Sequence, residues 1–126
     1  MKKGFLIVFF VCLWSCDSTE KYSFIVENNS SSPIDISFSV KNKDTLLVIP
    51  INKQVLINQS VEVSKPGVDY YLNKQIPLPK NLIIRKNKEL LRFNVFNREY
   101  WKFENRELNP VYILNLKNND FTEMVN

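Results

Sequence analysis

The chain has 126 residues, with 17 lysines and arginines, 13 aspartates and glutamates, and no histidine. Histidine is the commonest general base and the commonest ligand of transition metals, so its absence argues against both kinds of site. The chain also has only two cysteines and two glycines. A sulfur metal centre and a glycine-rich phosphate loop are therefore not expected, and we predict no cofactor, no metal and no enzymatic activity.

The first residues form a targeting pattern. Lys2 and Lys3 precede ten uninterrupted apolar residues, FLIVFFVCLW at positions 5–14. A helix of ten residues rises about 15 Å, roughly half of the ~30 Å hydrocarbon core of a bilayer, so the run is too short for a stable span. A positive start followed by an apolar run of about 7–15 residues is typical of a secretory signal peptide.

The apolar run ends in Leu13-Trp14-Ser15-Cys16, an aliphatic residue, a spacer, a small residue and a cysteine. This order resembles the lipobox of bacterial lipoproteins. The resemblance implies cleavage before Cys16, attachment of diacylglycerol to its thiol and acylation of the new amine. The alternative is an ordinary secretory signal with a chance cysteine. We predict a signal peptide over 1–15, a lipidated cysteine and tether over 16–20, and one β-rich domain over 21–126.

Removal of the leader changes the charge and the cysteine count of the chain. Lys2 and Lys3 leave with it, so 15 basic residues face 13 acidic ones and the net charge falls to +2. This value does not predict a nucleic-acid partner. Cys12 is also removed, so the folded domain has no thiol and no disulfide.

The first half of the domain predicts short strands separated by turns. Apolar and polar residues alternate over 22–26 and, most strictly, over 34–40, as in strands with one buried face. The Asn- and Ser-rich stretch 28–33 predicts a turn between them. After a turn at 42–44, the apolar run 45–51 predicts a strand that Pro50 interrupts.

The second half is predicted in the same way. Short strands are expected at 55–57 and 61–63, followed by a type II turn at 65–68 with Pro66 second and Gly67 third. Residues 70–72 are expected to be extended, and 76–79, with Pro77 and Pro79, to cross between sheets. Strands at 82–85 and 91–96 flank a turn at 86–88. Residues 97–105 fit either a helix or a strand, 111–116 a last strand, and 118–125 one helical turn.

These elements predict a mainly β fold: a single β-sandwich or a partly open barrel, with at most one or two short helical turns near the C-terminus. The leader, the Asn-rich first turn, and the segments 91–96, 100–103 and 112–121 resemble the small uncharacterised lipoproteins of Bacteroidota-type bacteria. The resemblance implies no activity.

Carboxylates are the only catalytic groups to consider, and they fall in two sequence clusters: Glu99, Glu104 and Glu107, and Asp120 with Glu123. Two carboxylates about 5–10 Å apart can hydrolyse glycosides. We favour solvated charges beside Arg98, Lys102 and Arg106 instead. A calcium site is disfavoured, because Asp44, Asp69 and Asp120 lack calcium-loop spacing.

The basic residues between 80 and 98 could meet anionic lipid or polysaccharide, but we favour a simpler interpretation. Arg85 and Arg92 are expected to point outward from strands, and Lys86 and Lys88 to lie on a turn.

Tyr100, Trp101 and Phe103 form the densest aromatic group of the domain. Aromatic side chains bind sugar rings and anchor interfaces, so these three residues are the candidate binding surface. They equally fill cores. If the stretch is a strand, Trp101 and Phe103 share the buried face and Tyr100 is exposed. We predict a core role for Trp101.

We interpret the chain as a lipid-anchored protein of the bacterial cell envelope, a non-catalytic binding or structural module. The expected partners are the membrane, through the lipid anchor, and an envelope protein or glycan. The alternatives are a small carboxylate-dependent hydrolase of envelope glycans and an accessory subunit of an envelope complex. Asp17 directly after Cys16 resembles the inner-membrane retention signal of enterobacteria. In Bacteroidota-type lipoproteins, however, acidic residues at this place accompany surface export, so the outer membrane is favoured.

Overall fold

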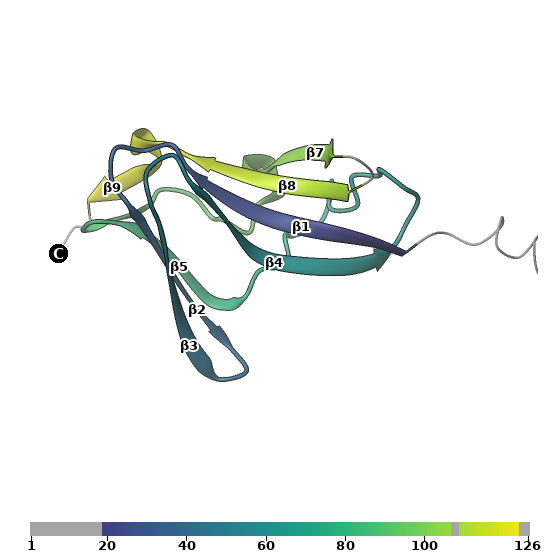
Figure 1. Cartoon of the computed structure of the whole chain (residues 1–126), viewed down its shortest axis with the longest axis horizontal. Helices are drawn as coiled ribbons and strands as arrows, with labels where there is room; N and C mark the ends of the chain where they lie inside the picture. The colour runs from purple at the N-terminus through teal and green to yellow at the C-terminus, as the bar shows by residue number, and fades with distance from the viewer. Residues whose placement is uncertain (1–18, 107–108, 124–126) are drawn as a thin grey trace, which may run out of the picture.

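Strands make up most of the domain, and they form two sheets packed face to face (Figure 1). The computed structural model describes residues 19–106 and 109–123, so the predicted leader and Cys16 lie outside the described residues. The first sheet has the order β4 (Gln54–Val63), β1 (Thr19–Asn28), β8 (Asn109–Leu116) and β7 (Lys102–Arg106). The second has the order β3 (Lys43–Ile49), β2 (Ile34–Val40), β5 (Lys80–Lys86), β6 (Glu89–Leu91) and β9 (Phe121–Glu123). The mainly β fold is confirmed, and of the two predicted architectures it is the sandwich.

Neighbouring strands are antiparallel except for β1 and β8, which run parallel from Ser23 opposite Val111 to Asn28 opposite Leu116. The chain passes from one sheet to the other through the segments 29–33, 50–53, 64–79, 92–101 and 117–120. The predicted crossover at 76–79 is one of these passages. Within the described residues, 19–106 and 109–123, no helix has the length and apolar character needed to cross a membrane.

Alternation along the strands places the core between the sheets. Tyr22, Phe24 and Val26 of β1 and Ile34, Ile36 and Phe38 of β2 are buried, and the residues between them, which are polar except for Ile25, point outward. β8 is buried on both faces over 110–114. The predicted type II turn is confirmed, because Gly67 has a φ of 76° and the Val68 amide donates to the Lys65 carbonyl at 3.3 Å.

Several predicted boundaries were wrong. The two strands at 55–57 and 61–63 are one strand, β4, which carries an extra residue: Phe24 pairs with Asn58 but Ile25 pairs with Leu56. This bulge leaves Ile57 unpaired and buried. The β2–β3 turn is at 41–42, where both residues have positive φ, as a two-residue hairpin turn requires.

Two other segments contain less strand than predicted. Residues 70–73 form a turn instead of an extended segment, and the strand predicted at 91–96 ends at Leu91. Residues 97–105 divide into a 3-10 turn, η1 (Arg98–Tyr100), and the strand β7. A second 3-10 turn, η2 (Asn118–Asp120), precedes β9, so β8 is not the last strand. These are the two short helical turns expected near the C-terminus.

Lys86 is the clearest exception to the predicted charges. It was expected on a turn, but its side chain lies on the inner face of β5 together with Ile84 and is 95% removed from solvent. Its ammonium donates to the Asn118 side chain at 3.0 Å and lies 3.4 Å from the Glu89 carboxylate. These partners compensate the burial of the charge.

Trp101 belongs to the core, as predicted. Only 2% of its surface is exposed, its ring meets Phe24 edge-on at 6.0 Å, and its indole nitrogen donates to the Val95 carbonyl at 2.8 Å. The indole therefore closes the core beneath the passage from β6 to β7.

Replacing Trp101 with alanine is expected to lower the free energy of unfolding by about 3–5 kcal/mol, because it removes a large aromatic side chain from the core. The measurement is urea denaturation followed by circular dichroism, since the substitution removes the only tryptophan of the domain. Leu46→Ala on the exposed face of β3 is the control and should change stability by no more than about 0.5 kcal/mol. Equal effects of the two substitutions would contradict the core role.

Candidate functional site

The three aromatic residues of the candidate binding surface lie in different surroundings. Trp101 is in the core, and Phe103 is half-buried against Tyr112, with ring centroids 5.1 Å apart. Tyr100 is 40% exposed and stacks on Phe93 at a centroid distance of 4.0 Å. Tyr100 is therefore the one member of the group that offers an exposed ring.

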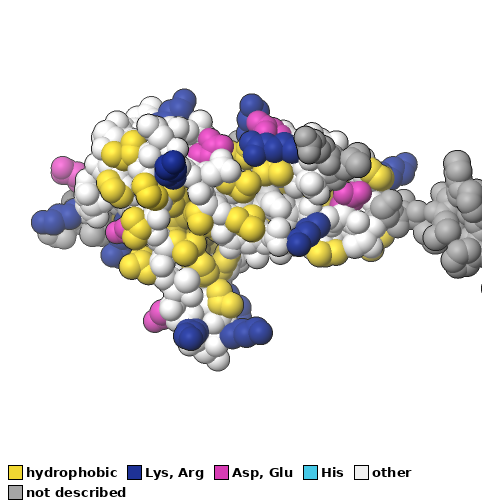
Figure 2. Space-filling view, in the orientation of Figure 1, with side chains coloured by type: hydrophobic (Ala, Val, Ile, Leu, Met, Phe, Trp, Pro, Cys, Tyr) yellow, Lys and Arg dark blue, Asp and Glu magenta, His cyan; other side chains and the backbone are white. Residues whose placement is uncertain are grey.

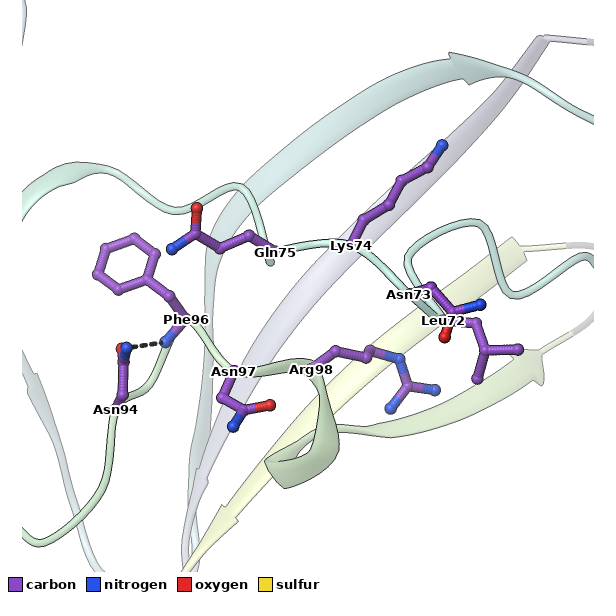
Figure 3. A pocket seen from close by; sticks show the side chains of 8 residues that line it. All are labelled: Leu72, Asn73, Lys74, Gln75, Asn94, Phe96, Asn97 and Arg98. Atoms are coloured by element: carbon purple, nitrogen blue, oxygen red, sulfur yellow. Dashed lines mark hydrogen bonds between the residues drawn. The ribbon is translucent and has the colours of Figure 1, made fainter.

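A polar surface hollow lies between two loops, 72–75 and 94–98, and its lining includes Arg98 of the 3-10 turn that contains Tyr100. It has a volume of about 440 Å³, and Figure 3 shows side chains from both loops around it. Four of the eight lining residues carry amides, two carry cations and two are apolar: Asn73, Gln75, Asn94, Asn97; Lys74, Arg98; Leu72, Phe96. We call this site the amide hollow.

Backbone contacts hold the two loops together. The Ile76 amide donates to the Phe96 carbonyl at 3.0 Å, which joins the loops at the floor of the hollow. The Asn94 side chain accepts from the Phe96 amide at 3.0 Å, and the Asn97 side chain accepts from the Glu99 amide at 3.2 Å to cap η1. These short-range contacts explain why asparagine occurs in a non-repetitive loop.

Arg98 is fixed by three groups. Its guanidinium forms an ion pair with Asp69, donates to the Trp101 carbonyl at 2.6 Å, and lies 5.1 Å from the centre of the Tyr112 ring. Asp69 also accepts from the Tyr112 hydroxyl. Because both carboxylate oxygens have partners, Asp69 positions Arg98 and is not free to act as a catalytic group.

Hydroxyl groups attach the loop 64–74 to the first sheet. The Tyr22 hydroxyl contacts Ser64 at 2.6 Å and donates to the Val68 carbonyl at 3.0 Å. The Tyr71 amide donates to the Tyr112 hydroxyl at 3.1 Å. Burial raises the pKa of the Tyr112 hydroxyl, and its hydrogen bond to Asp69 raises that pKa further, so the group remains a protonated donor.

A second hydroxyl network ends at Glu62 of β4. The Tyr71 hydroxyl lies 2.6 Å from the Ser60 hydroxyl and donates to the Glu62 carboxylate at 2.8 Å, which Ser60 also reaches at 2.7 Å. These two hydrogen bonds lower the pKa of Glu62, the Ser60 bond more than the Tyr71 bond. Burial raises the pKa of Tyr71. The network therefore joins an ionised carboxylate to protonated hydroxyls.

The carboxylates considered from the sequence are spread over the surface. Glu104 pairs with Arg106 at 2.8 Å and Lys102 at 3.3 Å, as expected for solvated charges, and these hydrogen bonds lower its pKa. Asp120 accepts from the Lys117 amide at 2.8 Å in η2. Glu107 lies outside the described residues. In the described part of the chain, no three residues among His, Cys, Asp and Glu lie close enough to hold a metal ion.

The chemistry of the amide hollow is recognition. An amide side chain offers both a donor and an acceptor, and a guanidinium or an ammonium offers donors and positive charge. Hydroxyl groups of a sugar both donate and accept, so they can be matched by such a lining. Asn94 and Phe96 also border an adjoining apolar hollow of about 250 Å³, lined by Leu82, Ile84 and Phe93 among others. Polar and apolar surfaces are thus available side by side.

Sequence reasoning did not find the amide hollow. Asn73, Gln75, Asn94 and Asn97 lie on loops that follow no periodic pattern, and the two loops meet only through the fold. The one available signal was the number of asparagines in the segments that follow β4 and β6. Tyr100, predicted as part of a binding surface, does not line the hollow, and Arg98 was considered only as one of the basic residues.

Glu62 is expected to make the stability of the domain depend on pH. Because its pKa is lower in the folded chain than its usual 4.5, its hydrogen bonds stabilise the fold above that pH, and this contribution is lost as the pH falls through it. Glu62→Gln should therefore unfold more easily at neutral pH, with a difference from the unmodified protein that shrinks as the pH falls below 4.5 and through the lowered pKa of the folded state. Thermal unfolding followed by circular dichroism measures this difference. Glu104→Gln, at an exposed ion pair, should show little change at either pH. A pH-independent difference for Glu62→Gln would contradict the network.

Comparison of the chain with protein-family models, with curated proteins and with solved structures finds no match. The leader pattern and the amide hollow are therefore the observations from which a function can be argued.

Proposed function

We propose that the protein is a lipoprotein of the bacterial cell envelope whose domain binds a ligand and catalyses no reaction. The leader supports the first part: Lys2 and Lys3, the ten apolar residues and Ser15-Cys16 follow one another in the order of a lipobox. β1 begins at Thr19, so the fold starts immediately after the proposed anchor. The outer membrane is the favoured location, because Asp17 and Glu20 follow the cysteine.

The amide hollow supports the second part, and its lining carries the proposal. Among its eight residues are four amides and two cations, and none of the eight is a carboxylate, hydroxyl or thiol. Such a lining can bind neutral or anionic hydroxyl-rich molecules, and it holds no carboxylate pair of the kind that hydrolyses glycosides. An envelope glycan, especially one that carries carboxylate or phosphate groups, matches this chemistry. A glycan is already present in the compartment in which we place the protein.

The surroundings of the acidic residues also favour a binding protein over a glycan hydrolase. Asp69 is bound by Arg98 and Tyr112, Glu62 by Ser60 and Tyr71, and Glu104 by Arg106 and Lys102. A glycosidase needs two carboxylates that face one substrate, one of them with a raised pKa. The resolved pKa shifts of Glu62 and Glu104 are both downward.

Cys16→Ser is expected to abolish lipid attachment. The full chain, expressed in a bacterial host that processes lipoproteins, should incorporate an alkyne-labelled palmitate, whereas the variant should not and should leave the detergent-extracted membrane fraction. Cys12→Ser is the matched control, because it changes the other cysteine of the same leader and should keep the label. Label retained by Cys16→Ser would refute the lipid anchor.

Glycan binding is expected to depend on the exposed amides of the hollow. On an array of bacterial envelope polysaccharides, the mature protein in detergent should bind at least one anionic glycan, and Asn73→Ala combined with Gln75→Ala should lose about tenfold or more in affinity, since several hydrogen bonds disappear. Gln54→Ala combined with Gln59→Ala removes two exposed amides from β4 and serves as the control. Equal binding by both double variants would exclude the hollow as the site, and cleavage of any glycan on the array would refute the non-catalytic role.

A further inference from the structure

The start of β1 lies close to the proposed anchor. Only Asp17 and Ser18 lie between Cys16 and Thr19, and the three Cα-to-Cα steps of this fully extended chain span at most about 11 Å. The headgroup region of a bilayer adds about 5–8 Å on each side of its hydrocarbon core. If Cys16 is lipidated, on which this inference rests, the part of the domain next to Thr19 lies at the headgroups.

Several segments meet at this end of the sandwich, which we call the anchor end. Thr19 pairs with Val63, the last residue of β4, and Tyr22 donates to the Val68 carbonyl at 3.0 Å. A Cβ on Gly67 would come within 2.6 Å of the Asn105 side chain, so the turn 65–68 lies against the end of β7. Figure 1 shows the start of β1 beside the end of β4 at this end of the domain.

The anchor end exposes three valines. Val61 is 61% exposed, Val63 66% and Val68 41%. Val61 and Val63 share the outer face of the first sheet with their partners Lys21 and Thr19. In Figure 2, hydrophobic side chains reach the surface beside the grey trace, with basic side chains close by. Exposed apolar residues at a free sheet edge are usually covered or replaced by charges, so this group calls for a covering surface.

The charges at the anchor end complement an anionic lipid surface. Lys21 and Lys65 are exposed, whereas Arg106 at the end of β7 pairs with Glu104 at 2.8 Å. Two further acidic residues are turned away or occupied: Glu20 is half-buried on the face of β1 opposite to Lys21, and the Glu62 carboxylate accepts from Ser60 and Tyr71. Basic side chains around exposed apolar residues are typical of surfaces that contact membranes.

We infer that the anchor end is a membrane-contacting surface: Val61, Val63 and Val68 enter the headgroup layer, and Lys21 and Lys65 meet lipid phosphates. The domain then stands on the bilayer with the axis of β1 pointing away from it. β1 rises about 30 Å from Thr19 to Asn28, so the opposite end of the sandwich lies outside the headgroup region.

Two exposed valines at opposite ends of the sandwich allow a matched test. Val63 is on the free edge strand β4, and Val48, 56% exposed, is on the free edge strand β3. Val48 lies near the far end, because its neighbour Ile49 accepts at its carbonyl from the Asn28 side chain at 2.8 Å. Each valine is replaced in turn by cysteine in the full chain, which the host processes. The mature proteins are labelled with a polarity-sensitive fluorophore and reconstituted into vesicles of phosphatidylethanolamine and phosphatidylglycerol.

The label at Val63→Cys should shift to shorter wavelength and be quenched by a lipid that carries a nitroxide on its headgroup, and the label at Val48→Cys should show neither effect. Val61→Cys, on the same face, should behave like Val63→Cys. Agreement between the two variants would show that the result does not come from a local folding defect at one position. Equal quenching at Val48 and Val63, or no quenching at either, would overturn the inference while the lipid anchor stands. Labelling of the mature protein without an added cysteine would show that the Cys16 thiol is free and would overturn the anchor and the inference together.

Discussion

The side chain of Asn28 holds the two sheets in their relative position. It is fully buried, and its amide nitrogen donates to the carbonyls of Ile49 and Ser32 at 2.8 and 2.9 Å. Its oxygen accepts from the amide and the hydroxyl of Ser30. An amide is suited to this place because it offers donors and acceptors at once, and an unpaired backbone carbonyl in the core is costly. β1 therefore ends, the chain turns and β2 begins around one residue.

The other end of the sandwich is closed by a loop that brings its own aromatic side chains. Tyr70 and Tyr71 come from the passage between β4 and β5, and their rings pack around Tyr22 at centroid distances of 5.9 and 5.7 Å. The hydroxyl groups buried here need hydrogen-bond partners: Ser64 contacts the hydroxyl of Tyr22, and Ser60 and Glu62 contact that of Tyr71. The same loop continues into one wall of the amide hollow. The wall is thus positioned by the packing of the core rather than by a helix or strand of its own.

The sequence predicted those parts of the fold that depend on neighbouring residues. Alternation identified β1 and β2, turn residues identified the type II turn, and paired prolines identified the passage between sheets. The parallel pairing of β1 with β8 has no local signal, because it joins the two ends of the domain. Lys86 could have been placed correctly, since it follows Leu82 and Ile84 with a spacing of two; its charge suggested a turn because the partners Glu89 and Asn118 were not visible in the local pattern. The amide hollow was not predicted: the aromatic residues proposed from the sequence, Tyr100, Trp101 and Phe103, do not line it, and asparagines in loops are defined by what the loops contact.

The pairing of β1 between β4 and β8 has a consequence for the route by which the domain forms. β1 is the first strand to be synthesised, yet one of its two neighbours ends at Leu116. Until that segment has been made, β1 has one flank without backbone partners, and its large aromatic side chains lack the face of Tyr112 and Leu114. Contacts that join distant parts of a chain form late and slowly, because the intervening loop must first be closed. An early strand of this kind keeps the chain from completing its first sheet until the residues of β8 have been made.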